Sequence, residues 1–73
     1  MNQPTLKADD IIKSLKRHGF RVIRQRGSHV RLRHEDGRVT TVSSHSGQDI
    51  GKGLLRKILR DTELTIAELT SET

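Results

Sequence analysis

One short segment limits the fold of this chain more than any other, because its side chains alternate strictly in polarity. Residues 29–34 read His-Val-Arg-Leu-Arg-His. Successive side chains of a β-strand point to opposite faces of the sheet, so a period of two predicts a strand with one buried face. Val30 and Leu32 are expected on the core side, and the first histidine and both arginines on the other side.

The segments before and after this strand have the composition of partner strands. Phe20–Arg26 is rich in β-forming residues, and Gly27-Ser28 connects it to the central strand. Asp36-Gly37 predicts a two-residue hairpin turn, since both positions accept a positive φ, and Arg38–Ser43 then returns as a third strand. We therefore expect three antiparallel strands joined by short connections.

Amphipathic helices are expected on both sides of the strands. Lys7–His18 is the first and ends at Gly19, and Ile50–Arg60 is the second. Their apolar residues recur at three- and four-residue spacing: Ala8, Ile11, Ile12 and Leu15, then Ile50, Leu54, Leu55, Ile58 and Leu59. Thr65-Ile66-Ala67-Glu68 matches a capping box and predicts a further short helix.

The predicted fold class is α+β, with a three-stranded antiparallel sheet and the helices packed on one of its faces. We expect residues 1–73 to form a single domain, with residues 1–6 as a loose leader and residues 61–73 as an acidic C-terminal segment. Only 30% of the residues are hydrophobic and Phe20 is the sole aromatic residue, so the core must be mostly aliphatic. The sheet face that the helices leave uncovered would carry the histidine and arginine side chains.

Charge is distributed unevenly along the chain. The net charge is +5, but all 14 Lys and Arg residues precede residue 61, and residues 61–73 contain four acidic residues. A basic body indicates a polyanionic partner and favours nucleic acid, and a solvated charge-rich surface is the alternative.

Other classes of protein are disfavoured by composition. The chain has no cysteine, which excludes disulfides and thiolate metal sites. No apolar run approaches the ~18 residues of a membrane span, and the first residues do not resemble a signal peptide. We therefore expect a cytoplasmic protein without a membrane partner or a small-molecule cofactor.

His29 is the candidate catalytic residue. It follows Gly27-Ser28 and lies in a segment with five arginines: Arg21, Arg24, Arg26, Arg31 and Arg33. Histidine can give or take a proton near neutral pH, and guanidinium groups bind phosphate. RNA supplies its own nucleophile, the 2′-hydroxyl, so these groups suit RNA cleavage. The alternatives are a solvent-facing strand histidine and a non-catalytic RNA-binding module.

The candidate RNA-binding residues extend along the basic strands and onto the second helix: Arg24, Arg26, Arg31, Arg33, Lys52 and Arg56. Gly27 and Ser28 form a tight turn, and they could also offer backbone N–H groups or a hydroxyl to phosphate. The four histidines lack the i, i+4 spacing of a helical zinc pair, so no metal site is expected. His18 suits the C-terminus of the first helix, His34 flanks the turn, and a role for His45 at the active face stays open.

The chain resembles the HicA toxins, the small ribonucleases of HicA–HicB toxin–antitoxin systems. The resemblance spans about residues 6–70 and rests on Gln25-Arg26-Gly27-Ser28-His29, on Val39-Thr40-Thr41-Val42, and on the segment from Gly47 to Leu59. It implies a fold similar to double-stranded RNA-binding domains, in the order α-β-β-β-α.

The resemblance also implies an activity and a partner. HicA toxins cleave mRNA without a metal ion, and His29 occupies the position of the family's catalytic histidine. The implied partner is a HicB-like antitoxin that covers the active face. A protein-interaction domain that meets an acidic partner through its basic face overlaps with this interpretation.

Overall fold

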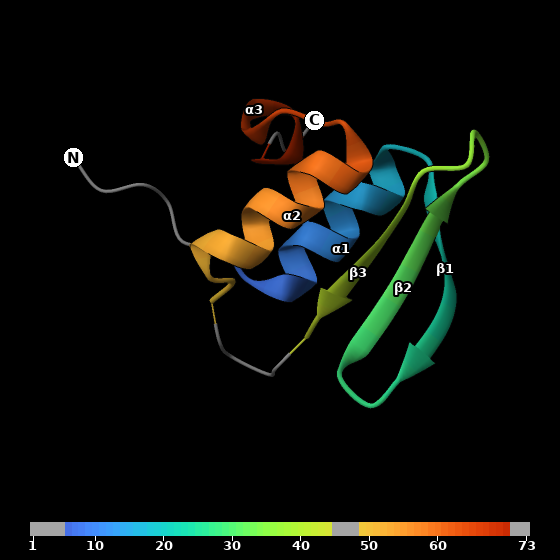
Figure 1. Ribbon diagram of the computed structural model, residues 1–73, viewed down its shortest axis with the longest axis horizontal. Coiled ribbons are helices and arrows are strands. Elements are labelled where there is room, and N and C mark those ends of the chain that lie inside the picture. Colours follow the sequence, from blue (N-terminus) through green and yellow to red (C-terminus); the bar gives the residue numbers. More distant parts are fainter. Residues whose placement is uncertain (1–5, 45–48, 71–73) are drawn as a thin grey trace.

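Helices and sheet form two layers in the computed structural model, which describes residues 6–44 and 49–70 (Figure 1). The elements in chain order are α1 (Ala8–Arg17), β1 (Phe20–Arg26), β2 (His29–His34), β3 (Val39–Ser43), α2 (Lys52–Thr62) and α3 (Ile66–Thr70). The strands are antiparallel in the order β1-β2-β3, and the helices lie together on one side of them. The predicted α+β class and element order are confirmed.

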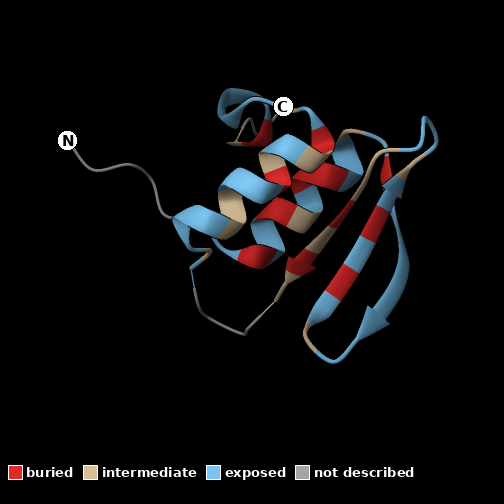
Figure 2. Ribbon diagram, viewed as in Figure 1, coloured by how far each residue is buried: buried red, intermediate tan, exposed pale blue. Residues whose placement is uncertain are grey.

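The alternation in β2 is the pattern that the structure follows most closely. Val30 and Leu32 are buried, whereas His29, Arg31 and Arg33 are exposed, as the banded colouring of β2 shows (Figure 2). The buried side belongs to one apolar cluster beneath the helices: Ala8, Ile11, Leu15, Phe20, Val30, Leu32, Val42, Ile58 and Leu69. We call the opposite side, which the helices leave uncovered, the open face.

Helix α2 begins and ends two residues later than its apolar pattern predicts. The Ile50 N–H donates to the Leu6 carbonyl at 2.7 Å, and Gly51 has an extended backbone, so the helix starts only at Lys52. Leu6 also packs against the core, unlike the loose leader expected for residues 1–6, of which residues 1–5 lie outside the described part. Ile58 is the one apolar residue of α2 that is fully buried.

The turn between β2 and β3 differs from the predicted two-residue turn. The Gly37 N–H donates to the His34 carbonyl at 3.0 Å, and the His34 N–H donates to the Arg38 carbonyl at 2.8 Å. Gly37 has a φ of 103°, but Asp36 is not in the left-handed region. The connection is therefore a three-residue loop, in which a β-turn is followed by a glycine with positive φ. The prediction of a two-residue turn at Asp36-Gly37 was wrong.

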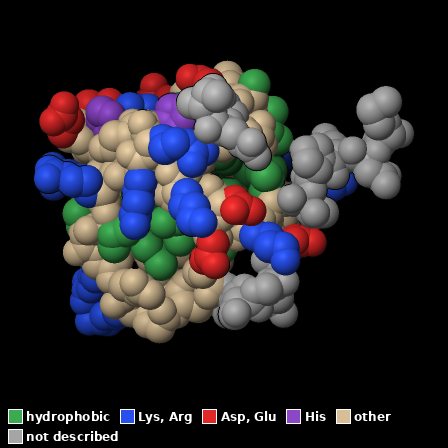
Figure 3. All heavy atoms as spheres, turned by 180° about the vertical axis from the view of Figure 1, so that it is seen from behind, with side chains coloured by type: hydrophobic (Ala, Val, Ile, Leu, Met, Phe, Trp, Pro, Cys, Tyr) green, Lys and Arg blue, Asp and Glu red, His purple; other side chains and the backbone are tan. Residues whose placement is uncertain are grey.

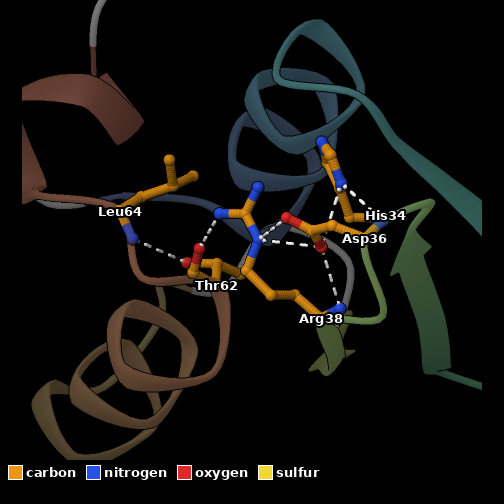
Figure 4. Close-up of polar contacts among 5 residues, drawn as sticks. All are labelled: His34, Asp36, Arg38, Thr62 and Leu64. Carbon is orange, nitrogen blue, oxygen red and sulfur yellow. Dashed lines mark hydrogen bonds and ion pairs between the residues drawn. The ribbon is translucent and has the colours of Figure 1, made fainter.

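Side chains around this turn join the sheet to the end of α2 (Figure 4). The Arg38 guanidinium donates to both Asp36 carboxylate oxygens, at 2.8 and 3.1 Å, and to the Thr62 carbonyl. The guanidinium also lies over the Phe20 ring, 5.2 Å from its centre. The His34 ring packs against the Phe20 ring in an edge-to-face arrangement. The hydrogen bond from the Arg38 backbone N–H, with a smaller contribution from the Arg38 side chain, holds the pKa of Asp36 below its ordinary range.

A second polar contact ties β3 to α2. Thr40 is only 2% exposed, and its hydroxyl donates to the Asp61 carboxylate at 3.0 Å. Lys57 donates to the same oxygen at 2.8 Å. Asp61→Ala is expected to lower the free energy of unfolding by about 1–3 kcal/mol, because a buried hydroxyl loses its acceptor. Lys57→Ala removes only an exposed ion pair and is expected to cost less than about 1 kcal/mol.

Urea unfolding at two pH values checks the contribution of the Thr40–Asp61 hydrogen bond to stability. Burial raises the pKa of Asp61, but the hydrogen bonds from Lys57 and Thr40 outweigh it, so the pKa lies below its ordinary value. A carboxylate of this kind stabilises the fold above the unfolded-state pKa and loses that effect as the pH falls below about 4. If the Asp61 and Lys57 variants lose the same free energy of unfolding, the role of the Thr40 contact is contradicted. The same holds if lowering the pH changes the stability of both variants equally.

The C-terminal helix begins as its capping box predicts. The Glu68 N–H donates to the Thr65 hydroxyl at 3.1 Å, and the Thr65 N–H donates to the Glu68 carboxylate at 2.9 Å. Leu69 then fixes α3 to the core beside α1. Among the helices of residues 6–44 and 49–70, none is long and apolar enough to cross a membrane.

Candidate functional site

The register of β1 against β2 brings the predicted arginines together in facing pairs. Residues directly opposite each other in an antiparallel pair project from the same face. The pairs on the open face are Arg21 with Arg33, Arg24 with Arg31, and Arg26 with His29. We call this double row the arginine ladder. Five guanidinium groups and one imidazole therefore line two adjacent strands on the side that the helices leave free.

This arrangement depends on an irregularity that the sequence pattern did not reveal. Strict alternation from the buried Phe20 would turn Arg24 and Arg26 toward the helix side of β1. The register instead shifts between Val22 and Arg24, which leaves Ile23 as an extra residue in the strand. Such a β-bulge re-aims the side chains that follow it. Arg24 and Arg26 thus share the open face with His29.

His29 lies at the hairpin end of the ladder and is exposed. Its cross-strand neighbours are Arg26 on β1 and Ser43 on β3. Within residues 6–44 and 49–70, no side chain makes a hydrogen bond or ion pair with its imidazole. The ring is therefore accessible to a ligand and next to a guanidinium group. His45, whose role sequence analysis left open, lies outside the described residues.

Gly27 and Ser28 form the turn next to His29. Gly27 has a φ of 54°, and its position is open, so a side chain there would be disfavoured by the backbone and not by crowding. The Ser28 carbonyl accepts a hydrogen bond from the Ser44 N–H, which attaches the turn to the residue after β3. This contact fixes the backbone at the end of the ladder where His29 begins β2.

Lys52 and Arg56 do not lie with the ladder. Both are exposed on α2, in the layer that covers the opposite side of the sheet, beside a groove lined by Leu55, Leu59 and Ile66. The predicted binding residues thus divide into a sheet group and a helix group. Basic side chains are spread widely over this protein, and the view from behind shows Lys and Arg beside exposed hydrophobic side chains (Figure 3).

The two other described histidines have structural partners. The His18 ring Nδ1 lies 2.8 Å from the Ser14 carbonyl at the C-terminus of α1, as expected for that position. His34 packs on Phe20 and its Nδ1 lies 3.0 Å from the Asp36 carboxylate. Among the described residues, no three His, Asp or Glu side chains come together as a metal site.

The fold and the open face together define a small α+β domain with a cationic sheet surface. The family described as "HicA toxin of bacterial toxin-antitoxin" matches residues 8–64 of the 73-residue chain. The match covers most of the chain, and the protein belongs to the HicA toxin family. It is therefore the toxin component of a toxin–antitoxin system, with an antitoxin as its counterpart. A search of the curated proteins returned no match.

Proposed function

We propose that this toxin is a metal-independent endoribonuclease that cleaves mRNA in the cytoplasm and uses His29 for proton transfer. The observation that carries the proposal is the exposed imidazole at one end of the arginine ladder, on the face that the helices leave open. Proton transfer and positive charge are the two things that cleavage of an RNA phosphodiester requires from a protein.

The reaction needs no nucleophile from the enzyme. His29 accepts the proton of a ribose 2′-hydroxyl, and the 2′-oxygen attacks the adjacent phosphorus. The bond between phosphorus and the 5′-oxygen breaks, and that oxygen takes a proton from water. The products are a 2′,3′-cyclic phosphate and a free 5′-hydroxyl. Arg26, directly opposite His29, is placed to stabilise negative charge on the phosphate oxygens.

A cleavage assay tests the proposed function. The purified toxin is incubated with a long mRNA in the presence of EDTA, and the ends of the products are analysed. Fragments with cyclic phosphate ends are expected. Cleavage that requires added Mg²⁺ would contradict the proposed chemistry. Tight RNA binding without cleavage would instead favour the alternative, a non-catalytic RNA-binding module.

The ladder makes a separate prediction about salt. Each guanidinium group that contacts phosphate releases counterions, so RNA affinity is expected to fall steeply as salt rises. Arg24 and Arg31 form one facing pair of the ladder. Each single substitution, Arg24→Ala or Arg31→Ala, is expected to reduce the slope of log Kd against log salt by about 0.7–1. Filter binding across a salt series measures this slope.

The helix layer supplies the control for this experiment. Arg60→Ala removes an exposed arginine in the last turn of α2 and is expected to leave the slope unchanged. Lys52→Ala and Arg56→Ala test whether the helix group also contacts RNA. An equal change in the Arg60 and Arg24 variants would show that net charge, and not the ladder, governs binding.

We also propose that a HicB-like antitoxin neutralises the toxin by covering the open face. A protein that covers His29 and the ladder must present acidic groups to this cationic surface. Such a partner would exclude RNA directly. Competition between the antitoxin and RNA for the toxin is therefore the expected behaviour.

A further inference from the structure

A hollow of about 420 Å³ lies near the end of the arginine ladder that is remote from His29. It is lined by Arg21, Val22, Ile23, Arg33, His34 and Glu35. Arg21 and Arg33 are cross-strand partners, so their side chains border the hollow from the open face. Its size lies within the range of ligand-binding pockets in proteins, roughly 300–1,000 Å³.

Ile23 is the residue that distinguishes this hollow from the rest of the ladder. Ile23 is 52% exposed, the largest fraction among the exposed large hydrophobic residues of the described chain. It is also the extra residue of the β-bulge, and the hydrophobic core does not include it. Phosphate binding does not explain an exposed isoleucine between two arginines, because phosphate has no apolar surface for it to contact.

We infer that the hollow holds an unstacked nucleobase of single-stranded RNA, at a subsite separate from the cleavage point. Unstacked bases pack against the planes of arginine guanidinium groups, and apolar side chains also line the pockets that hold flipped bases. Ile23 offers the apolar contact, and Arg21 and Arg33 offer guanidinium planes. The hollow therefore adds Arg21, Ile23 and Glu35 to the residues that contact RNA.

The charge on the rim favours some bases over others. The Glu35 carboxylate accepts hydrogen bonds and donates none, so it suits a base with an exocyclic amino group. Adenine, cytosine and guanine carry such a group and uracil does not. Arg33 lies four residue steps along the strand from His29, a span of about 13 Å, so the subsite lies a short distance along the RNA from the cleaved bond.

The inference rests on the proposed function for its ligand, and binding measurements keep the two apart. The His29→Ala toxin, which should bind RNA without cutting it, is the parent for a binding series. Ile23→Ser in this background is expected to weaken RNA binding about fivefold, the fold-change that corresponds to roughly half of the free energy of burying an isoleucine side chain. Ile66→Ser changes another exposed isoleucine, on α3, and is the matched control. Because Ile66 borders the groove beside Lys52 and Arg56, the control is read as the difference in affinity between intact and abasic RNA, which Ile66→Ser is expected to leave unchanged.

RNA oligonucleotides with one abasic position locate the subsite. We expect an abasic site at one particular position of the RNA to weaken binding to the His29→Ala toxin. On that RNA, adding Ile23→Ser to the His29→Ala toxin should weaken binding no further. Equal binding by the Ile23 and Ile66 variants, or an Ile23 effect that persists on every abasic RNA, would overturn the inference. So would an Ile23→Ser toxin that binds RNA normally and loses affinity for the antitoxin, since the hollow would then be a protein contact. Failure of the unsubstituted toxin to cleave RNA would overturn the proposed activity alone.

Discussion

His29→Ala is expected to lower the rate of RNA cleavage by roughly 10²–10⁴-fold, the usual contribution of one positioned proton-transfer group. The side chain is exposed and makes no polar contact within the described part of the chain, so its removal should not disturb the fold. The five arginines remain, and RNA affinity should therefore stay near that of the parent. Rate and affinity are measured separately, by single-turnover cleavage and by filter binding.

A second histidine serves as the control. His18 lies at the C-terminus of α1, where its ring contacts the Ser14 carbonyl, away from the ladder. His18→Ala is expected to cleave RNA at the parent rate, and its expression should still arrest growth. A His29→Ala toxin that cleaves RNA as fast as the parent would remove His29 from the mechanism and direct attention to other groups.

Phe20→Ala is expected to cost about 3–5 kcal/mol of stability, the range for removing a large buried aromatic side chain. Phe20 is 1% exposed and lies at the start of β1, where the core, His34 and Arg38 all contact its ring. A domain of this size has a total stability of roughly 4–11 kcal/mol. The loss is therefore a large fraction of the total, and the variant should unfold at a much lower denaturant concentration than the unsubstituted protein.

Chemical denaturation followed by circular dichroism measures this loss. Phe20→Leu keeps most of the apolar volume, so it is expected to lower the free energy of unfolding by less than Phe20→Ala does. Repacking should cost less than about 1.5 kcal/mol, in addition to the loss of the ring's contacts with His34 and Arg38. If the alanine and leucine variants are equally stable, the apolar volume at this position does not govern stability, which would contradict the expected loss.

The parts of the fold that follow a regular period could be predicted from the sequence. The alternation in residues 29–34 predicted which side of β2 is buried, and Gly19 ended the first helix with a φ of 91°. The turn at Asp36-Gly37 was predicted at the right place but with the wrong geometry. Local residue preference identifies a turn, whereas the number of loop residues depends on which strand residues pair.

The candidate site could be predicted only in part. His29 and the arginines of β2 share one face by simple alternation, but Arg24 and Arg26 join them only because of the bulge at Ile23. A single extra residue reverses every side chain that follows it in the strand, and the sequence pattern does not mark its position. Lys52 and Arg56 were grouped with the ladder on charge alone, and the three-dimensional structure places them in the other layer.

Strand β1 forms one border of the sheet, with β2 as its only strand neighbour among the described residues. The exposed border of a sheet is a template onto which another extended chain can hydrogen-bond, and proteins discourage this with charged side chains and bulges. β1 has both, since three arginines and the bulge at Ile23 fall within seven residues. Two copies that approached through β1 would bring like charges together on a distorted strand. The charges and the bulge to which we assign RNA binding therefore also oppose self-association of the free toxin.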